Sequence, residues 1–339
     1  MLNVIYFTAL ACLFIQLSRM LALRHNVLLD VPNGRKQHHA ATPCTGGVGI
    51  VIAALAGVAL QQASVFQQEP WYFLGLGAIF VLGVLDDLMD LSPKTKLLVE
   101  LPLISTVLLF FSQYPSFESE HLLPIFWAKW FGVGFAIFLM LGFINALNMT
   151  DGVDGLAGFL SLYYAAVCAG LAAALEQTVI TYLALGLVGS LIGFLLFNFR
   201  TPFGRKALVF LGDSGSMALG FALGWLGLAL TQHGLPEVLV LWLMSYPAFD
   251  SVSTALRRVM KGKNPMHGDR THLHHLLPEL GFSSAHTVTL IGIVSAGLTT
   301  FGFWLWHCQV SSLALFWAWG LAGAFYVVLT IFIESKVTK

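Results

Sequence analysis

Residues 155–197, GLAGFLSLYYAAVCAGLAAALEQTVITYLALGLVGSLIGFLLF, form two uncharged apolar runs that are separated by a single charged residue, Glu176. A helix needs about 20 mostly apolar residues to cross the hydrocarbon core of a bilayer, and the runs 155–175 and 177–197 both reach that length. The stretch therefore predicts two consecutive transmembrane helices.

The rest of the chain has the same character. Of its 339 residues 57% are hydrophobic and 10% are charged, with a mean hydropathy of +0.80, whereas about a quarter of the residues of a water-soluble globule are charged. The composition excludes a soluble globule and predicts an all-α polytopic membrane protein. Eleven apolar runs are expected to be spans: 1–23, 46–61, 71–86, 95–112, 127–147, 155–175, 177–197, 214–231, 237–256, 286–307 and 311–333.

The basic residues predict the orientation. Sixteen of the 17 Lys and Arg residues fall at or beyond one membrane face, and Lys129 is the exception. By the positive-inside rule that face is cytoplasmic, so the N-terminus is expected outside and the C-terminus inside. The basic residues of this face are Arg19, Arg24, Arg35, Lys36, Lys94, Lys96, Arg200, Arg205, Lys206, Arg257, Arg258, Lys261, Lys263, Arg270, Lys336 and Lys339.

The chain shows no sign of a second domain. The first run has no basic residue ahead of it and no small-x-small cleavage pattern at its end, so we expect a retained anchor rather than a signal peptide. We expect residues 1–339 to form one integral membrane domain whose cytoplasmic loops, near 24–45, 87–94, 148–154, 198–213 and 257–285, hold the active site. The cysteines at 12, 44, 168 and 308 have no paired spacing and indicate no disulfide framework.

Three aspartates close the run that begins at residue 71. In LDDLMDLSPK, Asp86 and Asp90 are four residues apart and Asp87 and Asp90 are three apart. If the helix continues through them, their Cβ atoms lie about 5–6 Å apart on one face. Crowded carboxylates persist where a cation, a basic side chain or a proton lies between them. A solvated helix end is the alternative, but further acids at the same membrane face favour a functional site.

Two more polar clusters are predicted at that face. In INALNMTDGVDG, the side chains of Asn145, Asn148 and Asp151 recur at three-residue steps, and polar groups at the end of a span usually face the protein interior or a water-filled cavity. Gly152 and Gly155 permit close approaches that a Cβ atom would block. Helix capping explains Asp151 or Asp154 alone but not the two asparagines as well.

GDSGS at 212–216 opens the run 214–231 and follows a basic loop. Small residues at a helix N-terminus expose backbone N–H groups to an anion, and the helix dipole adds partial positive charge. Asp213 in this position suits Mg²⁺ that bridges to phosphate, because Mg²⁺ usually takes one or two protein carboxylates. Simple capping by Ser or Asp is the alternative.

The loop after residue 256 carries RRVMKGKNPMHGDRTHLHH, with three histidines in four residues. Its first basic residues are typical of a topology determinant that binds anionic headgroups. Zinc is one option for the histidines, but phosphate binding beside Arg270 is favoured. Glu100 and Asp250 are polar positions inside apolar runs, for which structural pairing is an equally good account, and Pro247 is expected to kink its helix.

Five segments, in this order, resemble the motifs of the WecA/MraY family of polyprenyl-phosphate N-acetylhexosamine-1-phosphate transferases. They are DVPNGRKQHH at 30–39, LDDLMDLSPKTKLL at 85–98, INALNMTDGVDGLAG at 144–158, FLGDSGS at 210–216 and RTHLHH at 270–275. The last segment is similar to the WecA form, which implies UDP-GlcNAc as the donor. The resemblance implies transfer of GlcNAc-1-phosphate to undecaprenyl phosphate with release of UMP, the first membrane step of O-antigen, common antigen or a similar envelope polysaccharide, at the bacterial inner membrane.

The resemblance also implies roles for individual residues. Asp213 is the expected Mg²⁺ ligand, with Asp86 or Asp87 as a further candidate, and Mn²⁺ is a candidate substitute for Mg²⁺. The catalytic positions implied are Asp86, Asp87, Asp90, Asp151 and Asp154. The substrate-binding positions implied are Asn145, Asn148, Arg270, His272, His274, His275, Lys94, Lys96, Arg35, Lys36 and His38.

Alternatives remain for the function. Relatives that use other UDP-N-acetylhexosamines share these motifs, and a covalent two-step mechanism through Asp86 stands beside the favoured single displacement. A secondary transporter would place its acids near the bilayer midplane in repeated halves, whereas these acids crowd the inner boundary. A nucleic acid partner is not expected, and a homodimer is one assembly that the sequence allows.

Overall fold

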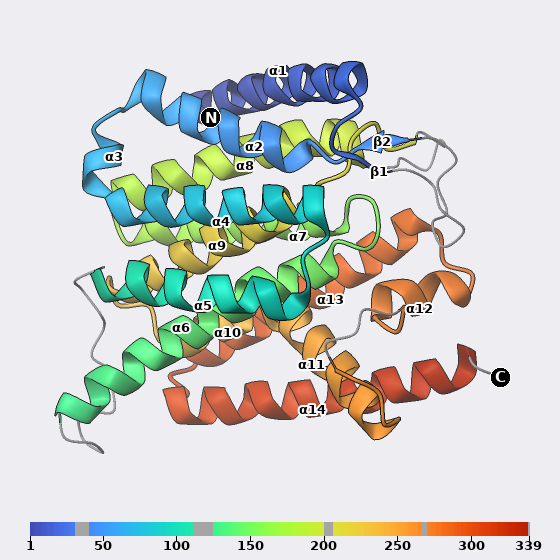
Figure 1. The fold of residues 1–339 in the computed structure, drawn as a ribbon. Helices are drawn as coiled ribbons and strands as arrows, with labels where there is room; N and C mark the ends of the chain where they lie inside the picture. The colour runs from blue at the N-terminus through green and yellow to red at the C-terminus, as the bar shows by residue number, and fades with distance from the viewer. Residues whose placement is uncertain (31–40, 111–124, 200–205, 266–269, 338–339) are drawn as a thin grey trace.

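One helix, α9 (Asp213–Thr231), is buried on all sides and forms the axis of the fold. In this computed structural model, which describes residues 1–30, 41–110, 125–199, 206–265 and 270–337, four helices provide most of the packing around α9. They are α2 (Gly46–Gln61), α4 (Pro70–Met89), α6 (Ile125–Thr150) and α7 (Leu156–Ala174). Most of the long helices run along a common direction (Figure 1), as expected for a membrane bundle.

The remaining elements surround this centre. The helix α1 packs on α2 and α8, and α14 packs on α11. A short antiparallel pair of strands, with Leu29 opposite Pro43, joins the two ends of the loop that follows α1. The remaining bounds are α1 (Leu2–His25), β1 (Leu29–Asp30), β2 (Thr42–Pro43), α3 (Val65–Gln68), α5 (Pro93–Phe110), α8 (Thr178–Asn198), α10 (Glu237–Leu243), α11 (Ser245–Met260), α12 (Leu273–Glu279), α13 (Ser284–His307) and α14 (Ser312–Val337).

The predicted fold class is confirmed, because the described residues are helical apart from the short β1–β2 pair and connecting segments. Within the described part of the chain, eight helices are each long and apolar enough to cross a membrane, and α10 with α11 forms a ninth, bent candidate. The other two predicted runs also coincide with helices. However, α2 has only 16 residues, and α5 carries Lys94, Lys96 and Glu100.

The predicted kink near Pro247 takes the form of a break. The helices α10 and α11 meet at an angle of 73°, and Met244 separates them. Pro247 is the third residue of α11, where a proline is tolerated because the first backbone N–H groups of a helix have no partner within it. The break therefore lies three residues before the proline.

Small residues let α9 approach its neighbours closely. A Cβ atom added to Gly220 of α9 would lie 2.5 Å from the Cα atom of Ile144 in α6, and one added to Gly83 of α4 would lie 2.5 Å from the Cα atom of Ser214. Close backbone approach at small residues is a general mode of helix packing in membranes. The contact at Gly83 also fixes the end of α4 against the N-terminus of α9.

The two termini lie at opposite ends of the bundle (Figure 1), in agreement with the predicted odd number of crossings. The β1–β2 pair, the α4–α5 turn, the α6–α7 loop and α12 lie at the same end as the C-terminus. Most of the loops that the sequence predicted to be functional therefore share one end of the molecule.

The Gly220→Ala substitution is expected to destabilise the protein, because the new Cβ atom meets the backbone of α6. Overpacking of this kind costs about 1–3 kcal/mol. Gly297→Ala in α13 is the matched control, since a Cβ atom there enters open space. Thermal unfolding in detergent should show a lower Tm for Gly220→Ala only. Equal Tm values for the two variants would contradict the close approach of α6 and α9.

Candidate active site

The N-terminus of α9 is closed by a carboxylate from another helix. The backbone N–H groups of Asp213 and Ser214 donate to Oδ1 and Oδ2 of Asp87 at 2.8 and 2.9 Å. Asp87 lies in the last turn of α4, and Gly212, with φ of 76°, turns the chain into α9. The sequence suggested that these backbone amides bind an external anion. In the structure Asp87 occupies them and acts as a helix cap.

Asp86 is also held in place, although by different partners. Only 4% of it is exposed. One carboxylate oxygen accepts a hydrogen bond from Leu91 N at 2.8 Å, and the other forms an ion pair with Lys96 Nζ at 2.6 Å. Lys96, one of the predicted substrate contacts, is therefore the cationic partner of a predicted catalytic residue.

Asp90 does not join this pair. The helix α4 ends at Met89, and Asp90 takes a left-handed conformation, with φ of 51°, as the C-terminal cap. Its side chain is exposed. The expected alignment of Asp90 with Asp86 and Asp87 depended on a helix that continues through the motif, and this condition is not met.

The end of α6 supplies the two predicted asparagines. Asn148 donates from Nδ2 to Asp213 Oδ1 and, at 2.9 Å, to Ser216 Oγ, both in α9. Asn145, one turn earlier, donates to Glu100 Oε2 in α5 at 2.6 Å and to Leu141 O. The asparagines therefore point to different helices, and Asn148 is the one that contacts Asp213.

The turn between α6 and α7, which carries Asp151 and Asp154, is held in place by Asn198. Gly155 has φ of 85°, and its N–H donates to Asn198 Oδ1 at 2.7 Å. Asn198 also donates to Val209 O at 2.9 Å, so it connects this turn to the segment that leads into α9. Sequence reasoning missed Asn198, whose only signal was a polar residue at the end of an apolar run.

Asp151 follows α6 in this turn, in the electric field of the other acids. Burial of the carboxylate raises the pKa of Asp151 to about 8, and the negative charges of Asp213, Asp154 and Asp87 add to the rise. Charges act on one another in this way only at short range. Aspartates from the three clusters that the sequence placed at one membrane face therefore lie close enough for their charges to act on one another.

The histidines lie against the same turn. A Cβ atom on Gly152 would fall 2.3 Å from Nε2 of His274 and 3.2 Å from Cε1 of His275, so only glycine allows the two loops to touch. The rings of His274 and His272 are stacked, with centroids 5.3 Å apart. His274 is fully buried, and burial lowers its pKa to about 3. It is therefore neutral at physiological pH.

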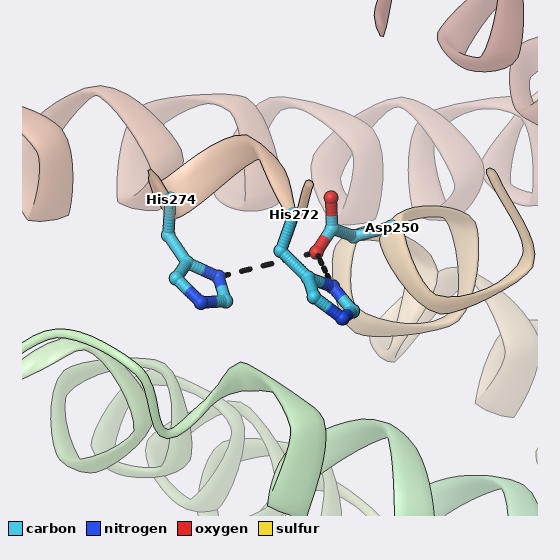
Figure 2. Close-up of side chains that lie close together, drawn as sticks. All are labelled: Asp250, His272 and His274. Atoms are coloured by element: carbon cyan, nitrogen blue, oxygen red, sulfur yellow. Dashed lines mark hydrogen bonds and ion pairs between the residues drawn. The ribbon is translucent and has the colours of Figure 1, made fainter. Parts of the chain in front are cut away.

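A buried carboxylate from α11 organises the histidine loop. Asp250 Oδ2 lies 2.8 Å from Nδ1 of His272 and 4.0 Å from Nδ1 of His274 (Figure 2). The possible ligand atoms of these three residues lie within 4.8 Å of one another, close enough to hold a metal ion. Structural pairing was one of the accounts expected for Asp250. Its partner is His272, a residue of the predicted site.

The basic residues of α11 have structural partners. Arg257 is buried and donates to Thr254 Oγ1 and Thr271 O at 3.0 and 2.7 Å, and its Nη1 lies 3.4 Å from Glu334 of α14. Glu334 also pairs with Lys261 at 2.8 Å. These contacts attach the start of the histidine loop to α14.

The remaining predicted residues are distributed as follows. Lys94 and Arg270 are exposed, and Asp154 is half-buried. Arg35, Lys36 and His38 lie outside the described residues. The site thus consists of an oxygen-rich cluster around Asp213 and a histidine loop beside it, and oxygen ligands of this kind are those that Mg²⁺ prefers.

Comparisons with known proteins agree with this arrangement. The model of glycosyl transferase family 4 matches residues 70–231, a range that contains Asp86, Asn148 and Asp213. The undecaprenyl-phosphate alpha-N-acetylglucosaminyl 1-phosphate transferase of Escherichia coli (strain K12) is 31% identical over 287 residues, which cover 81% of this chain and 76% of that protein.

Two further relatives extend the match. The protein of the same name from Yersinia pestis is 31% identical over 312 residues, covering 88% of this chain and 82% of that protein. The probable undecaprenyl-phosphate N-acetylglucosaminyl 1-phosphate transferase of Bacillus subtilis (strain 168) is 30% identical over 271 residues, covering 78% of this chain and 74% of that protein. The likeness therefore spans most of both chains.

Asp151→Asn is expected to reduce the pH dependence of stability in metal-free protein. The pKa of Asp151 is about 8 in the folded chain, against about 3.9 for an unfolded Asp. Its contribution to stability is therefore fully present below about pH 4 and is lost as the pH rises through about 8. Melting curves in EDTA from pH 5 to 9 should show a smaller fall in Tm for Asp151→Asn. The same fall in both proteins would contradict the raised pKa.

Proposed function

Because this chain belongs to glycosyl transferase family 4, we propose that it transfers GlcNAc-1-phosphate from UDP-GlcNAc to undecaprenyl phosphate. The products are GlcNAc-diphosphoundecaprenol and UMP. The names of the relatives support the acceptor and the transferred group. The proposed role of this product is to supply the first lipid-linked sugar of an envelope polysaccharide, such as O-antigen.

The observation that carries the proposal is the convergence of acidic and amide side chains around the start of α9. Asp87 binds the first amides of α9, Asn148 binds Asp213, and Asp86 lies beside them with Lys96. Four separate helices, α4, α5, α6 and α9, contribute these groups. Such a cluster at one end of a bundle suits a reaction between a water-soluble donor and a membrane-confined acceptor.

The proposed location is the bacterial cytoplasmic membrane, with the site facing the cytosol. Lys96 pairs with Asp86 in the site, and Arg19 donates to Leu208 O in the segment that leads into α9, as the positive-inside rule requires of a cytoplasmic face. UDP-GlcNAc then arrives from the cytosol. Undecaprenyl phosphate arrives within the bilayer, with its phosphate at the same boundary.

Mg²⁺ is the proposed cofactor, with Asp213 as its ligand. Asp86 and Asp87, the further candidates from the sequence, each have both carboxylate oxygens engaged by other groups of the protein. The fit rests on the donor set, because the carboxylates of Asp86, Asp87 and Asp213 gather here, and their mutual repulsion favours a cation. When bound, Mg²⁺ neutralises charge on the diphosphate and supports the UMP leaving group. Asn148 holds Asp213 in a fixed orientation for this purpose.

The other residues bind, orient and stabilise the two substrates. Asp86, held by Lys96, is proposed to position the acceptor phosphate or take up its proton. Asp151 and Asp154 organise the nucleotide side of the site. The histidine loop, His272 to His275 with Arg270, is proposed to bind the diphosphate and sugar. Lys94, Arg35, Lys36 and His38 remain predicted substrate contacts, and Asp90 a predicted catalytic position.

We favour a single displacement. The acceptor phosphate has a second ionisation at about pH 6, so it already carries a nucleophilic oxygen near pH 7. That oxygen attacks the β-phosphorus, and the bond to the UMP oxygen breaks. Asp86 has both oxygens engaged, by Leu91 and Lys96, which favours positioning over covalent attack.

Purified protein should form GlcNAc-diphosphoundecaprenol and UMP from undecaprenyl phosphate, radiolabelled UDP-GlcNAc and Mg²⁺. Turnover should stop in EDTA and return with Mg²⁺, and Mn²⁺ is expected to substitute. A panel of other UDP-N-acetylhexosamines tests the donor. The absence of turnover with every UDP-sugar, or activity that ignores EDTA, would refute the proposed function.

The matched variants for this assay are Asp213→Asn and Glu279→Gln. The first removes the proposed metal ligand while it keeps the size of the side chain, and turnover should fall by at least about 10²-fold. The second makes the same chemical change at an exposed residue at the end of α12 and should leave turnover unchanged. Full activity in a folded Asp213→Asn protein would refute the metal assignment.

A further inference from the structure

His272 is held by a carboxylate outside the oxygen-rich cluster. Asp250 lies in α11, and His272 is the N-terminal cap of α12. The side chains of Asp250 and His272 are 1% and 7% exposed, and Asp250 Oδ2 lies 2.8 Å from His272 Nδ1. Figure 2 shows the ring of His272 turned toward this oxygen. The two residues form a buried pair between elements 22 residues apart in the sequence.

The other oxygen of Asp250 anchors the pair to the fold. Asp250 Oδ1 accepts a hydrogen bond from Leu273 N at 3.0 Å and one from the hydroxyl of Tyr326 in α14 at 2.9 Å. The carboxylate is thus fixed by a backbone amide of α12 and a side chain of α14. Neither bond depends on a substrate, so the orientation is set before a substrate binds.

This geometry determines which nitrogen of His272 carries the proton. A carboxylate only accepts hydrogen bonds, so the ring must donate from Nδ1. Thr254 Oγ1, at 3.4 Å from the same nitrogen, is a weaker partner. The tautomer with hydrogen on Nδ1 leaves Nε2 as the basic nitrogen, and a carboxylate behind the ring stabilises the imidazolium that forms when Nε2 takes up a proton.

The ring lies next to the proposed substrate site. His272 stacks on His274 at 5.3 Å, and His274 contacts Gly152 in the α6–α7 turn. When Nε2 of His272 gains a proton, it becomes a hydrogen-bond donor to an anionic phosphate oxygen. Charge-assisted hydrogen bonds of this kind are roughly twice as strong as neutral ones.

A metal ion between Asp250, His272 and His274 is the competing explanation, since their ligand atoms lie within 4.8 Å of one another. The hydrogen bonds argue against it. Asp250 already accepts from three donors at 2.8–3.0 Å, whereas His274 Nδ1 stays 4.0 Å away. The carboxylate is therefore satisfied as the partner of one histidine.

We propose that Asp250 is a positioning residue, which keeps the ring proton of His272 on Nδ1 so that Nε2, once it has taken up a proton, donates to a diphosphate oxygen of the donor substrate. The role in turnover rests on the proposed transferase function. The tautomer of His272 does not, so it can be measured whether or not the protein turns over UDP-GlcNAc.

The test compares Asp250→Asn with Tyr326→Phe. Both remove a hydrogen bond from the same carboxylate site, but only the first alters the partner of His272. The amide NH₂ of Asn donates to Nδ1 and moves the ring proton to Nε2. Nitrogen-15 NMR of histidine-labelled protein, assigned with His272→Gln, should show this tautomer change in Asp250→Asn and not in Tyr326→Phe.

Turnover provides the second readout. Asp250→Asn should lower kcat by about 10- to 100-fold, with a smaller change in KM for UDP-GlcNAc, and Asp250→Glu should restore part of kcat. Tyr326→Phe should stay within about threefold of the starting kcat. If the role is only structural, the two variants lose Tm alike and folded Asp250→Asn keeps its kcat, which overturns the proposal.

Two further outcomes are informative. A His272 tautomer with hydrogen on Nε2 in the unaltered protein would overturn the proposal directly. So would one zinc ion per purified chain that is lost in Asp250→Asn, since Asp250 would then be a metal ligand. If the NMR result holds but no UDP-sugar is turned over, the pairing stands and the proposed function fails.

Discussion

The buried N-terminus of α9 is the constraint on which the site depends. Because α9 is enclosed by other helices, its first amides have no access to bulk water, and Asp87 satisfies them from α4. The side chain of Asp213, the first residue of α9, is held by Asn148 from α6. Packing therefore forces carboxylates from separate helices into one small region, where they repel each other unless a cation is present.

The membrane spans and the location of the site were predictable from composition and pattern. Apolar runs near 20 residues have few alternatives to helices in a bilayer, so each predicted run has a helical counterpart. The polar clusters at 86–90, 145–155 and 212–216 could be assigned to one end of the bundle because the basic residues identify the membrane face at which each cluster lies. Gly152 and Gly155 were correctly expected at close approaches, against His274 and Phe199.

Tertiary partners could not be predicted in the same way. Spacing along α4 gave no sign that the helix would end at Met89, so Asp90 was aligned with residues that it does not join. Nor does spacing reveal that Asp87 caps a helix 126 residues away, or that Asp250 meets both His272 and Tyr326. Such contacts depend on how whole helices pack, which a single sequence does not encode locally.

Binding of a divalent cation tests the central claim most directly. Electron paramagnetic resonance of Mn²⁺ added to purified protein in the presence of UDP, without an acceptor lipid, measures the number of bound ions per chain. The account predicts one Mn²⁺ site that Mg²⁺ displaces and that Asp213→Asn abolishes, while Glu279→Gln retains it. One site of unchanged affinity in Asp213→Asn would contradict the convergence of these carboxylates around a single cation.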